Sequence, residues 1–294
     1  MKAVSCLLIA ALALPTLATA RDMSPEDVRK LPATAPTLTE AYGADPHEIG
    51  ELRVPKGKGP FPVAIVIHGG CWTKGFETIR GTAPIASALA AKGIATWNVE
   101  YRQIGDPGGG WPGTFIDWAN GADHLRTLAK RYPLDLKRVI VVGHSAGALA
   151  ALWVAARPRL DPAITVRGSD PLRVRAAVAI DGPGDLAPFV GKDKAVCGAP
   201  VISQLLGGTP DAVPDRYRDG SPFRALPLGL PQTLVASAVL DPSEAETYRA
   251  AAAAKGDAVT VVTTPNSDHF NIIAPGEPQW AAVEAAILKA IPPE

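Results

Sequence analysis

Cysteine is scarce in this chain, and an excess of either charge is absent. Only 3 of the 294 residues are Cys, and 29 Lys and Arg balance 29 Asp and Glu. Nowhere do five charges of one sign follow one another, so the chain lacks the clustered cations whose counterion release drives binding to nucleic acid or to an anionic membrane surface. The five His residues lie far apart and form no Cys/His cluster with zinc spacing. We therefore expect neither nucleic acid nor a metal ion as a partner.

A dinucleotide-binding fingerprint is also missing. Gly108, Gly110 and Gly113 satisfy the G-x-G-x-x-G spacing, but they lie well past the end of the preceding predicted strand, and Pro112 falls among them. The fingerprint requires a turn directly between a strand and a helix, and an acidic residue at the end of the following strand. We reject dinucleotide binding and expect no cofactor.

The chain is rich in apolar residues, which make up 47% of it and suffice for one large core. A continuous apolar run such as 62–67 is typical of a strand buried on both faces of a parallel sheet. The predicted strands are 48–54, 62–67, 94–99, 138–142, 175–180, 233–239 and 258–263, and the predicted helices are 83–91, 115–131, 146–156, 242–254 and 279–291. Because strands and helices alternate, we expect an α/β fold with a mostly parallel, doubly wound sheet. Residues 182–231 are rich in Pro and Gly, and we expect them to form a cap insertion over the carboxyl ends of the strands.

The first 20 residues have the pattern of a targeting signal. Lys2 precedes an apolar run at residues 6–14, and the segment ends in Ala-Thr-Ala, the small-residue pattern after which signal peptidase cleaves. The run is too short for a transmembrane helix, which needs about 20 apolar residues. We expect a signal peptide at 1–20, a single domain at 21–294 without a membrane span, and an exported protein that is periplasmic or secreted.

Export would leave two cysteines in the mature chain, Cys71 and Cys197, because Cys6 lies within the predicted signal. Disulfides form and persist in the compartments to which exported proteins go. A disulfide between these residues is one interpretation, and two small buried thiols are the other. The sequence leaves both open.

The candidate nucleophile is Ser145, in the G-x-S-x-G motif at residues 143–147. The motif directly follows a predicted strand and begins a predicted helix, which is the context of a nucleophile elbow. The two glycines allow neighbouring backbone to pack closely while the serine occupies a strained turn. The helix N-terminus also favours negative charge that develops nearby.

A second glycine-rich turn, His-Gly-Gly-Cys-Trp at residues 68–72, follows the buried strand 62–67. Its backbone amides at Gly70 and Cys71, together with the amide of Ala146, are the candidate oxyanion hole. Such donors stabilise a tetrahedral intermediate by about 3–4 kcal/mol each. We expect His68 to hold this loop by hydrogen bonds rather than to act as a base.

The candidate general base is His269, which lies just past the last predicted strand and so reaches the same sheet edge as Ser145. His47 precedes the core and His124 lies within a predicted helix. His144 is adjacent to the nucleophile, and its side chain should not face Ser145 productively.

The candidate acid is Asp241, which follows the predicted strand 233–239 and gives the order serine, acid, histidine along the chain. The other interpretation of Asp241 is an N-cap for the helix that follows it. Asp268 is a rival acid, but adjacent residues rarely place a carboxylate against the far nitrogen of an imidazole. Asp181 and Asp185, after the strand 175–180, are lesser candidates.

Together these motifs resemble the α/β-hydrolase superfamily over nearly the whole chain after residue 20. The resemblance is greatest to esterases with an HGG-aromatic loop, a branch that includes kynurenine formamidase-like enzymes. It rests on residues 68–72, Tyr101-Arg102, residues 143–147, Ser221-Pro222, Asp241 and His269-Phe270. Cys71 stands where the HGGG form of the loop has its third glycine.

The resemblance implies a serine hydrolase that cleaves a small-molecule carboxylic ester through an acyl-enzyme. Amide hydrolysis, of a formamidase-like or peptidase-like kind, is an alternative, and a binding protein without catalysis is another. Trp72 and Tyr101, with Phe189 and Phe223 of the insertion, are candidates to line an apolar substrate pocket, although core packing would explain each of them equally well. The natural substrate and the oligomeric state stay open.

Overall fold

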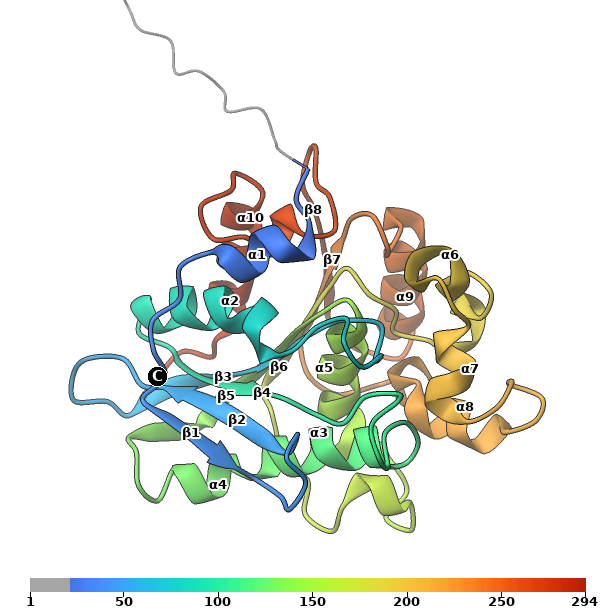
Figure 1. Ribbon diagram of the computed structural model, residues 1–294, viewed down its shortest axis with the longest axis horizontal. Helices are drawn as coiled ribbons and strands as arrows, with labels where there is room; N and C mark the ends of the chain where they lie inside the picture. Colours follow the sequence, from blue (N-terminus) through green and yellow to red (C-terminus); the bar gives the residue numbers. More distant parts are fainter. Residues whose placement is uncertain (1–21) are drawn as a thin grey trace, which may run out of the picture.

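The computed structural model describes residues 22–294, and the predicted signal peptide lies outside this range. One eight-stranded sheet has the order β1-β2-β4-β3-β5-β6-β7-β8 (Figure 1). Its strands are β1 (Leu38–Ala41), β2 (Ile49–Arg53), β3 (Phe61–Ile67), β4 (Ala95–Val99), β5 (Leu134–His144), β6 (Ala176–Ile180), β7 (Gln232–Ala236) and β8 (Val259–Thr263). All six strands from β4 to β8 in this order are parallel. The predicted α/β class with a mostly parallel sheet is confirmed.

The antiparallel edge of the sheet was only partly predicted. β2 pairs antiparallel with β4, and β1 covers the outer edge of β2. The sequence of β1 alternates between half-buried and exposed positions, so it lacks the apolar run by which the central strands were recognised. As a result β2, the first of the predicted strands, lies second in the sheet.

Helices cover both faces of the sheet (Figure 1). They are α1 (Pro25–Lys30), α2 (Ile79–Ala91), α3 (Gly113–Asp123), α4 (Leu125–Leu128), α5 (Ala146–Ala156), α9 (Pro242–Ala253) and α10 (Trp280–Ala290), with 3-10 turns η1 (Arg157–Arg159), η2 (Thr165–Arg167) and η5 (Asn271–Ile273). The predicted helix 115–131 is therefore two shorter helices. No helix within residues 22–294 has both the length and the apolar character that a membrane crossing requires.

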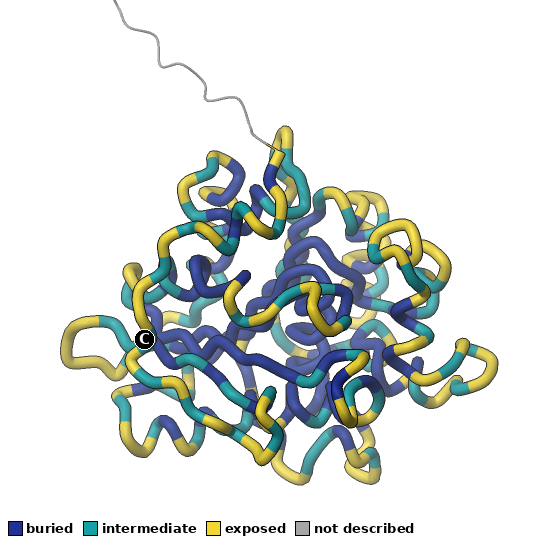
Figure 2. The backbone as a smooth tube through the Cα atoms, in the orientation of Figure 1, coloured by how far each residue is buried: buried dark blue, intermediate teal, exposed yellow. Residues whose placement is uncertain are grey.

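Strand β3 shows why its sequence is apolar throughout. Val63, Ile65 and Ile67 pack into one cluster with α3, α5 and α9, whereas Ala64 and Val66 pack into a second cluster with α1, α2 and α10. Alternate side chains thus enter opposite cores, as period-two geometry requires. The central strands and α5 are the most deeply buried part of the chain (Figure 2).

Between β6 and β7 the chain forms a group of short helices. They are η3 (Ala187–Phe189), α6 (Asp193–Cys197), α7 (Val201–Leu206), α8 (Pro214–Gly220) and η4 (Pro222–Ala225). The indole of Trp153 in α5 donates to the Asp219 carbonyl at 2.9 Å, and the Trp111 amide donates to the Leu205 carbonyl at 2.6 Å. These bonds fix the insertion to the body of the fold.

Candidate active site

Ser145 lies at a sharp turn between β5 and α5. Its backbone has φ 57° and ψ −122°, a conformation that side chains rarely adopt and that costs about 1–3 kcal/mol. The flanking glycines explain how the turn closes. A Cβ on Gly143 would lie 1.9 Å from the Gly147 carbonyl oxygen, and one on Gly147 would lie 2.2 Å from the Ile67 carbonyl oxygen. The G-x-S-x-G spacing therefore follows from packing as well as from conformation.

The glycine-rich loop after β3 packs directly against this turn. A Cβ on Gly69 would lie only 2.8 Å from the Cβ of Ser145. Gly70 and Cys71 follow with φ values of 96° and 53°. The amides of Cys71 and Ala146 have no acceptor among the described residues, and Ala146 is the first residue of α5, where helix N–H groups are unpaired. Both amides are thus available at the edge of the cavity beside Ser145.

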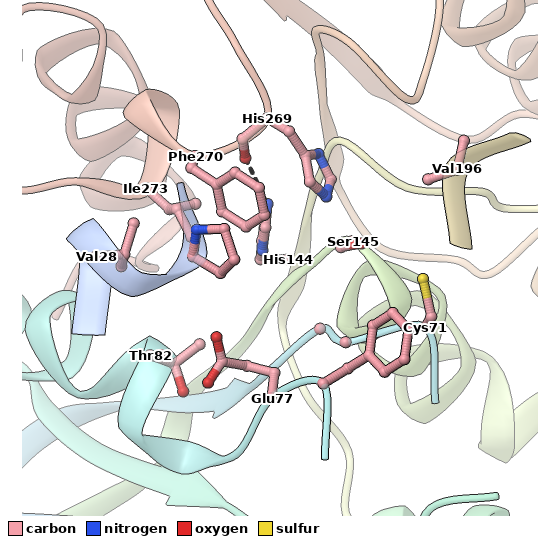
Figure 3. Close-up of a pocket in the computed structure, with 15 residues that line it drawn as sticks. Val28, Cys71, Glu77, Thr82, His144, Ser145, Val196, His269, Phe270 and Ile273 are labelled. Carbon is pink, nitrogen blue, oxygen red and sulfur yellow. Dashed lines mark hydrogen bonds between the residues drawn. The ribbon is translucent and has the colours of Figure 1, made fainter. Parts of the chain in front are cut away.

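His269 follows β8 and shares a cavity with Ser145. Its ring points towards Ser145 in Figure 3. On the other side, its Nδ1 lies 2.7 Å from Oδ2 of Asp181, the residue directly after β6. Because an ionised carboxylate only accepts hydrogen bonds, Nδ1 carries the proton and Nε2 is left as an acceptor. This is the tautomer that a general base needs.

Asp181 is completely buried, and four contacts hold its carboxylate. Besides His269, it accepts hydrogen bonds from the backbone amides of Ser237 at 3.0 Å, Val239 at 3.1 Å and Leu240 at 2.8 Å. Burial opposes ionisation, but the hydrogen bond and charge of His269, with the Leu240 amide, outweigh it and hold the pKa of Asp181 below its ordinary value. Asp181 is therefore ionised beside the imidazole at neutral pH.

The prediction of Asp241 as the acid is wrong. Asp241 is exposed and caps α9: its Oδ1 accepts from the Ser243 amide at 2.8 Å, and Glu244 accepts a bond from the Asp241 amide at 3.3 Å. The residues just before it turn their amides towards Asp181, and this turn ends β7 at Ala236 instead of at residue 239. The carboxylate that contacts His269 thus belongs to Asp181, directly after β6, which the sequence offered as a lesser candidate.

The two histidines in the glycine-rich turns have structural roles. His144 donates from Nε2 to the His269 carbonyl at 2.8 Å, and burial, with the adjacent His269 ring, lowers its pKa so that it stays neutral. His68 contacts Glu100 at 2.7 Å through Nε2 and the Gly69 carbonyl at 2.8 Å through Nδ1. Since both partners are acceptors, the His68 ring donates twice and is positively charged. Burial opposes that charge, but Glu100 outweighs it and raises the pKa of His68. His68 thus holds the loop, as expected.

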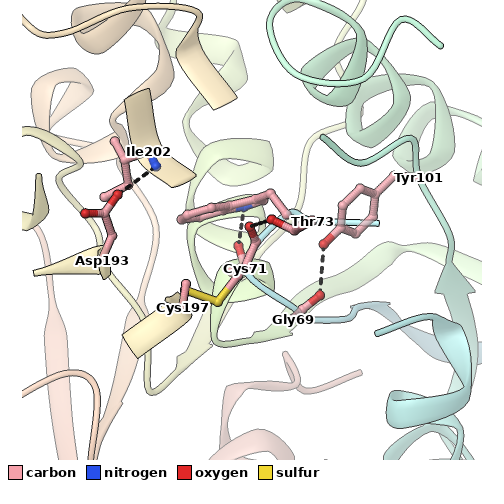
Figure 4. Close-up of a disulfide and its surroundings, with 9 residues drawn as sticks. Gly69, Cys71, Thr73, Tyr101, Asp193, Cys197 and Ile202 are labelled. Atoms are coloured by element: carbon pink, nitrogen blue, oxygen red, sulfur yellow. Dashed lines mark hydrogen bonds between the residues drawn. A yellow bond between two sulfur atoms is a disulfide. The ribbon is translucent and has the colours of Figure 1, made fainter. Parts of the chain in front are cut away.

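Tyr101 does not line a substrate pocket, contrary to the prediction. Its side chain is fully buried, and its hydroxyl donates to the carbonyls of His68 at 3.0 Å and Gly69 at 3.2 Å. Its ring stacks on His68 with centroids 4.3 Å apart. Tyr101 therefore holds the glycine-rich loop in place through its hydroxyl and its ring (Figure 4). Trp72 does border a cavity, and its indole donates to the Ala146 carbonyl at 3.1 Å.

Cys71 and Cys197 form a disulfide, which settles the choice that the sequence left open (Figure 4). Their Cα atoms are 6.0 Å apart, and 126 positions separate them in the chain. Cys71 belongs to the glycine-rich loop, and Cys197 ends α6 of the insertion. The bond therefore joins the candidate oxyanion hole to the helices that border the cavity.

Removing this disulfide will destabilise the protein. A cross-link that closes so long a loop limits the unfolded chain, and its loss costs about 2–5 kcal/mol in exported domains. We expect the double variant C71S/C197S to unfold at a lower urea concentration than the wild type, with a free energy of unfolding lower by about 2–5 kcal/mol. Dithiothreitol should lower the midpoint of the wild type and leave that of the variant unchanged. Equal midpoints for oxidised wild type and variant would contradict the prediction.

Two cavities meet at Ser145. The larger, of about 260 Å³, is bordered by Glu77, His269 and Phe270 and opens beside the exposed side chains of Phe76 and Val196 (Figure 3). The smaller, of about 30 Å³, lies between the glycine-rich loop and the insertion. Within residues 22–294 no group of three or more His, Cys, Asp or Glu side chains could hold a metal ion.

Known proteins share this sequence pattern and this fold. The BD-FAE family matches residues 52–243, more than half of the chain. Esterase LipC of Mycobacterium tuberculosis is 30% identical over 200 residues, which cover 66% of this chain and 48% of LipC. The chain thus spans about half the length of that relative.

Solved structures agree on the architecture. Esterase B from Lactobacillus Rhamnosis superposes with a TM-score of 0.73 at 20% identity, over 90% of this chain and 88% of that one. A truncated carbohydrate esterase from gut microbiota gives 0.70 at 17%, over 86% and 94%. The narrower resemblance to kynurenine formamidase-like enzymes stays a prediction. The matched segment and the shared architecture assign this chain to the BD-FAE family of proteins with the α/β-hydrolase fold.

Proposed function

We infer that the protein is a serine hydrolase that cleaves carboxylic esters of small molecules. One observation carries this conclusion: the hydrogen bond between Asp181 and Nδ1 of His269, which leaves Nε2 of that ring free in the cavity of Ser145. Unpaired amides at Cys71 and Ala146 border the same serine. Nucleophile, base, orienting acid and oxyanion donors are the full set that acyl transfer requires.

The reaction then follows from these groups. His269 Nε2 takes the proton of the Ser145 hydroxyl as its Oγ bonds to the ester carbonyl carbon, and the amides of Cys71 and Ala146 stabilise the resulting oxyanion. His269 returns the proton to the alcohol oxygen as the C–O bond breaks, which leaves an acyl-enzyme. Water attacks the acyl carbon with His269 again as base, and Ser145 and a carboxylic acid are released. Asp181 stabilises the imidazolium in both steps.

Relatives support esters over other substrates. LipC and the structural neighbour from Lactobacillus are both named as esterases. We carry this activity to the present chain as part of the proposal.

A pair of matched substrates tests it. 4-Nitrophenyl acetate and 4-nitroacetanilide share an acyl group and differ in the atom that leaves. We expect the ester to be cleaved and the anilide to be left intact, and a fluorophosphonate to label Ser145, as read by peptide mass spectrometry. Cleavage of the anilide alone would establish an amide hydrolase instead. A folded protein that cleaves neither and is not labelled would be a binding protein.

We also propose that the protein is exported. The disulfide supports this, because such bonds persist in oxidising compartments, and the signal-like pattern of residues 1–20 supports it independently. Determining the N-terminal residue of protein purified from the periplasm or medium of an expressing bacterium tests the proposal; full-length protein in the cytoplasm would refute it.

A further inference from the structure

The two cavities at Ser145 differ in their relation to the base. Ser145 and Cys71 border both cavities, whereas His269 borders the larger one and Ala146 the smaller one. The base must hand its proton to the departing alcohol oxygen, so the alcohol part of an ester leaves on the His269 side. The acyl group extends to the other side of the oxyanion hole. The smaller cavity is therefore the acyl site.

This acyl site is short. Its volume of about 30 Å³ is roughly that of two water-sized groups. Its walls are mostly apolar. Asp193 is an ionisable residue among them, and both of its carboxylate oxygens accept hydrogen bonds: one from the Gly191 amide at 3.0 Å and one from the Ile202 amide at 2.8 Å (Figure 4). The space therefore favours a short acyl group, such as acetyl, over a longer chain.

A third cavity of about 190 Å³ shares one lining residue with the acyl site. It is bordered by Phe223, Leu234 and Tyr248, and it does not include Ser145. One residue borders both this cavity and the acyl site: Phe189, the last residue of η3. Elsewhere the two cavities are separated by consecutive residues of the loops after β6 and β7.

Contacts around Phe189 fix its ring in this wall. The ring is half-buried and packs against the cluster that β3 forms with α3, α5 and α9. The ammonium of Lys192 lies 5.2 Å from the ring centroid and is paired with Glu244 of α9. This cation–π contact and ion pair connect the insertion to α9 across the third cavity.

We propose that Phe189 determines acyl-chain length: its ring closes the acyl site, selects esters of short acyl groups, and separates that site from a cavity that would accept the distal carbons of a longer chain. The inference rests on the proposed ester hydrolysis and adds to it the substrate class. Each buried methylene that a pocket accepts or rejects changes specificity by about tenfold or more.

The test measures kcat/KM for 4-nitrophenyl acetate, butyrate, hexanoate and octanoate, which share one leaving group. We expect the wild type to prefer acetate over octanoate, and Phe189→Ala to lower that preference by at least about tenfold, with acetate still cleaved. Phe189→Leu should open the wall less and give an intermediate dependence of kcat/KM on chain length. This variant replaces Phe189→Ala in the test if the alanine variant is unstable. Phe76→Ala is the matched control, because Phe76 borders only the larger cavity and should change all four rates by a common factor.

The outcomes separate the two proposals. A wild-type enzyme that cleaves octanoate as fast as acetate would overturn the short acyl site. Folded Phe189 variants with the wild-type chain-length profile and retained acetate cleavage would overturn the role of Phe189 and leave ester hydrolysis standing. A wild type that cleaves none of the four esters would overturn both.

Discussion

Replacing Asp181 with Asn lowers kcat by about 10⁴-fold, the loss seen when the acid of a serine-protease triad is converted to its amide. The introduced amide side chain can still accept the loop N–H groups through its oxygen, but its NH₂ group then faces Nδ1 of His269. That arrangement makes Nδ1 an acceptor and moves the ring proton to Nε2. The imidazole can then no longer take the proton of Ser145. Steady-state hydrolysis of 4-nitrophenyl acetate measures the loss.

Asp241→Asn is the matched control for this variant. Asn is as good an N-cap as Asp. Asp241 is exposed, and its hydrogen bonds are to Ser243 and Glu244 of α9 rather than to His269. We expect its kcat to stay at the wild-type level. Circular dichroism and the melting temperature should show both variants folded. A large loss in Asp241→Asn with an active Asp181→Asn would restore the sequence-based assignment.

Ser145→Ala lowers kcat by about 10⁵–10⁶-fold, because the covalent route is removed. The fold should persist: Ser145 makes no side-chain capping bond at α5, so Ala leaves no backbone amide without a partner. Fluorophosphonate labelling should disappear together with turnover.

Ser221→Ala controls for the loss of a buried hydroxyl. Ser221 is buried, and its hydroxyl accepts a hydrogen bond from the Leu186 amide at 3.1 Å rather than contacting His269. Its loss should lower stability by about 1 kcal/mol and leave labelling at Ser145 intact. Turnover or labelling that survives in Ser145→Ala would remove Ser145 from the proposed mechanism.

The sharp turn at Ser145 and the position of His269 in the same cavity could be predicted because local sequence determines them. The glycines around Ser145 are required because a Cβ at Gly143 or Gly147 would lie 1.9 or 2.2 Å from a backbone carbonyl oxygen, so the motif indicates the turn directly. His269 follows a strand whose carboxyl end must lie at the same edge of the parallel sheet. The central strands β3, β5, β6 and β7 could be predicted for a related reason: their apolar runs enter two cores at once.

The acid could not be predicted this way, because Asp181 and Asp241 look alike in sequence. Each follows an apolar strand and precedes Gly or Pro. What distinguishes them is which carboxylate the loop amides face, and that depends on the packing of β6 beside β7. One local signal did favour the N-cap: Asp241 is followed three residues later by Glu244, the capping-box spacing. Tyr101 was misplaced for a similar reason, since its burial depends on the position of the His68 loop.

The amides that hold Asp181 also restrict how this site could change over time. Ser237, Val239 and Leu240 all donate to that one carboxylate. A chain that lost Asp181 and relied on Asp241 would leave these donors without this acceptor, at about 1–3 kcal/mol for the buried Leu240 amide, and would have to rebuild the loop and the start of α9 at once. No single substitution does this. We therefore expect the acid to stay at Asp181, because a series of single substitutions that each keep the protein stable does not lead from Asp181 to Asp241.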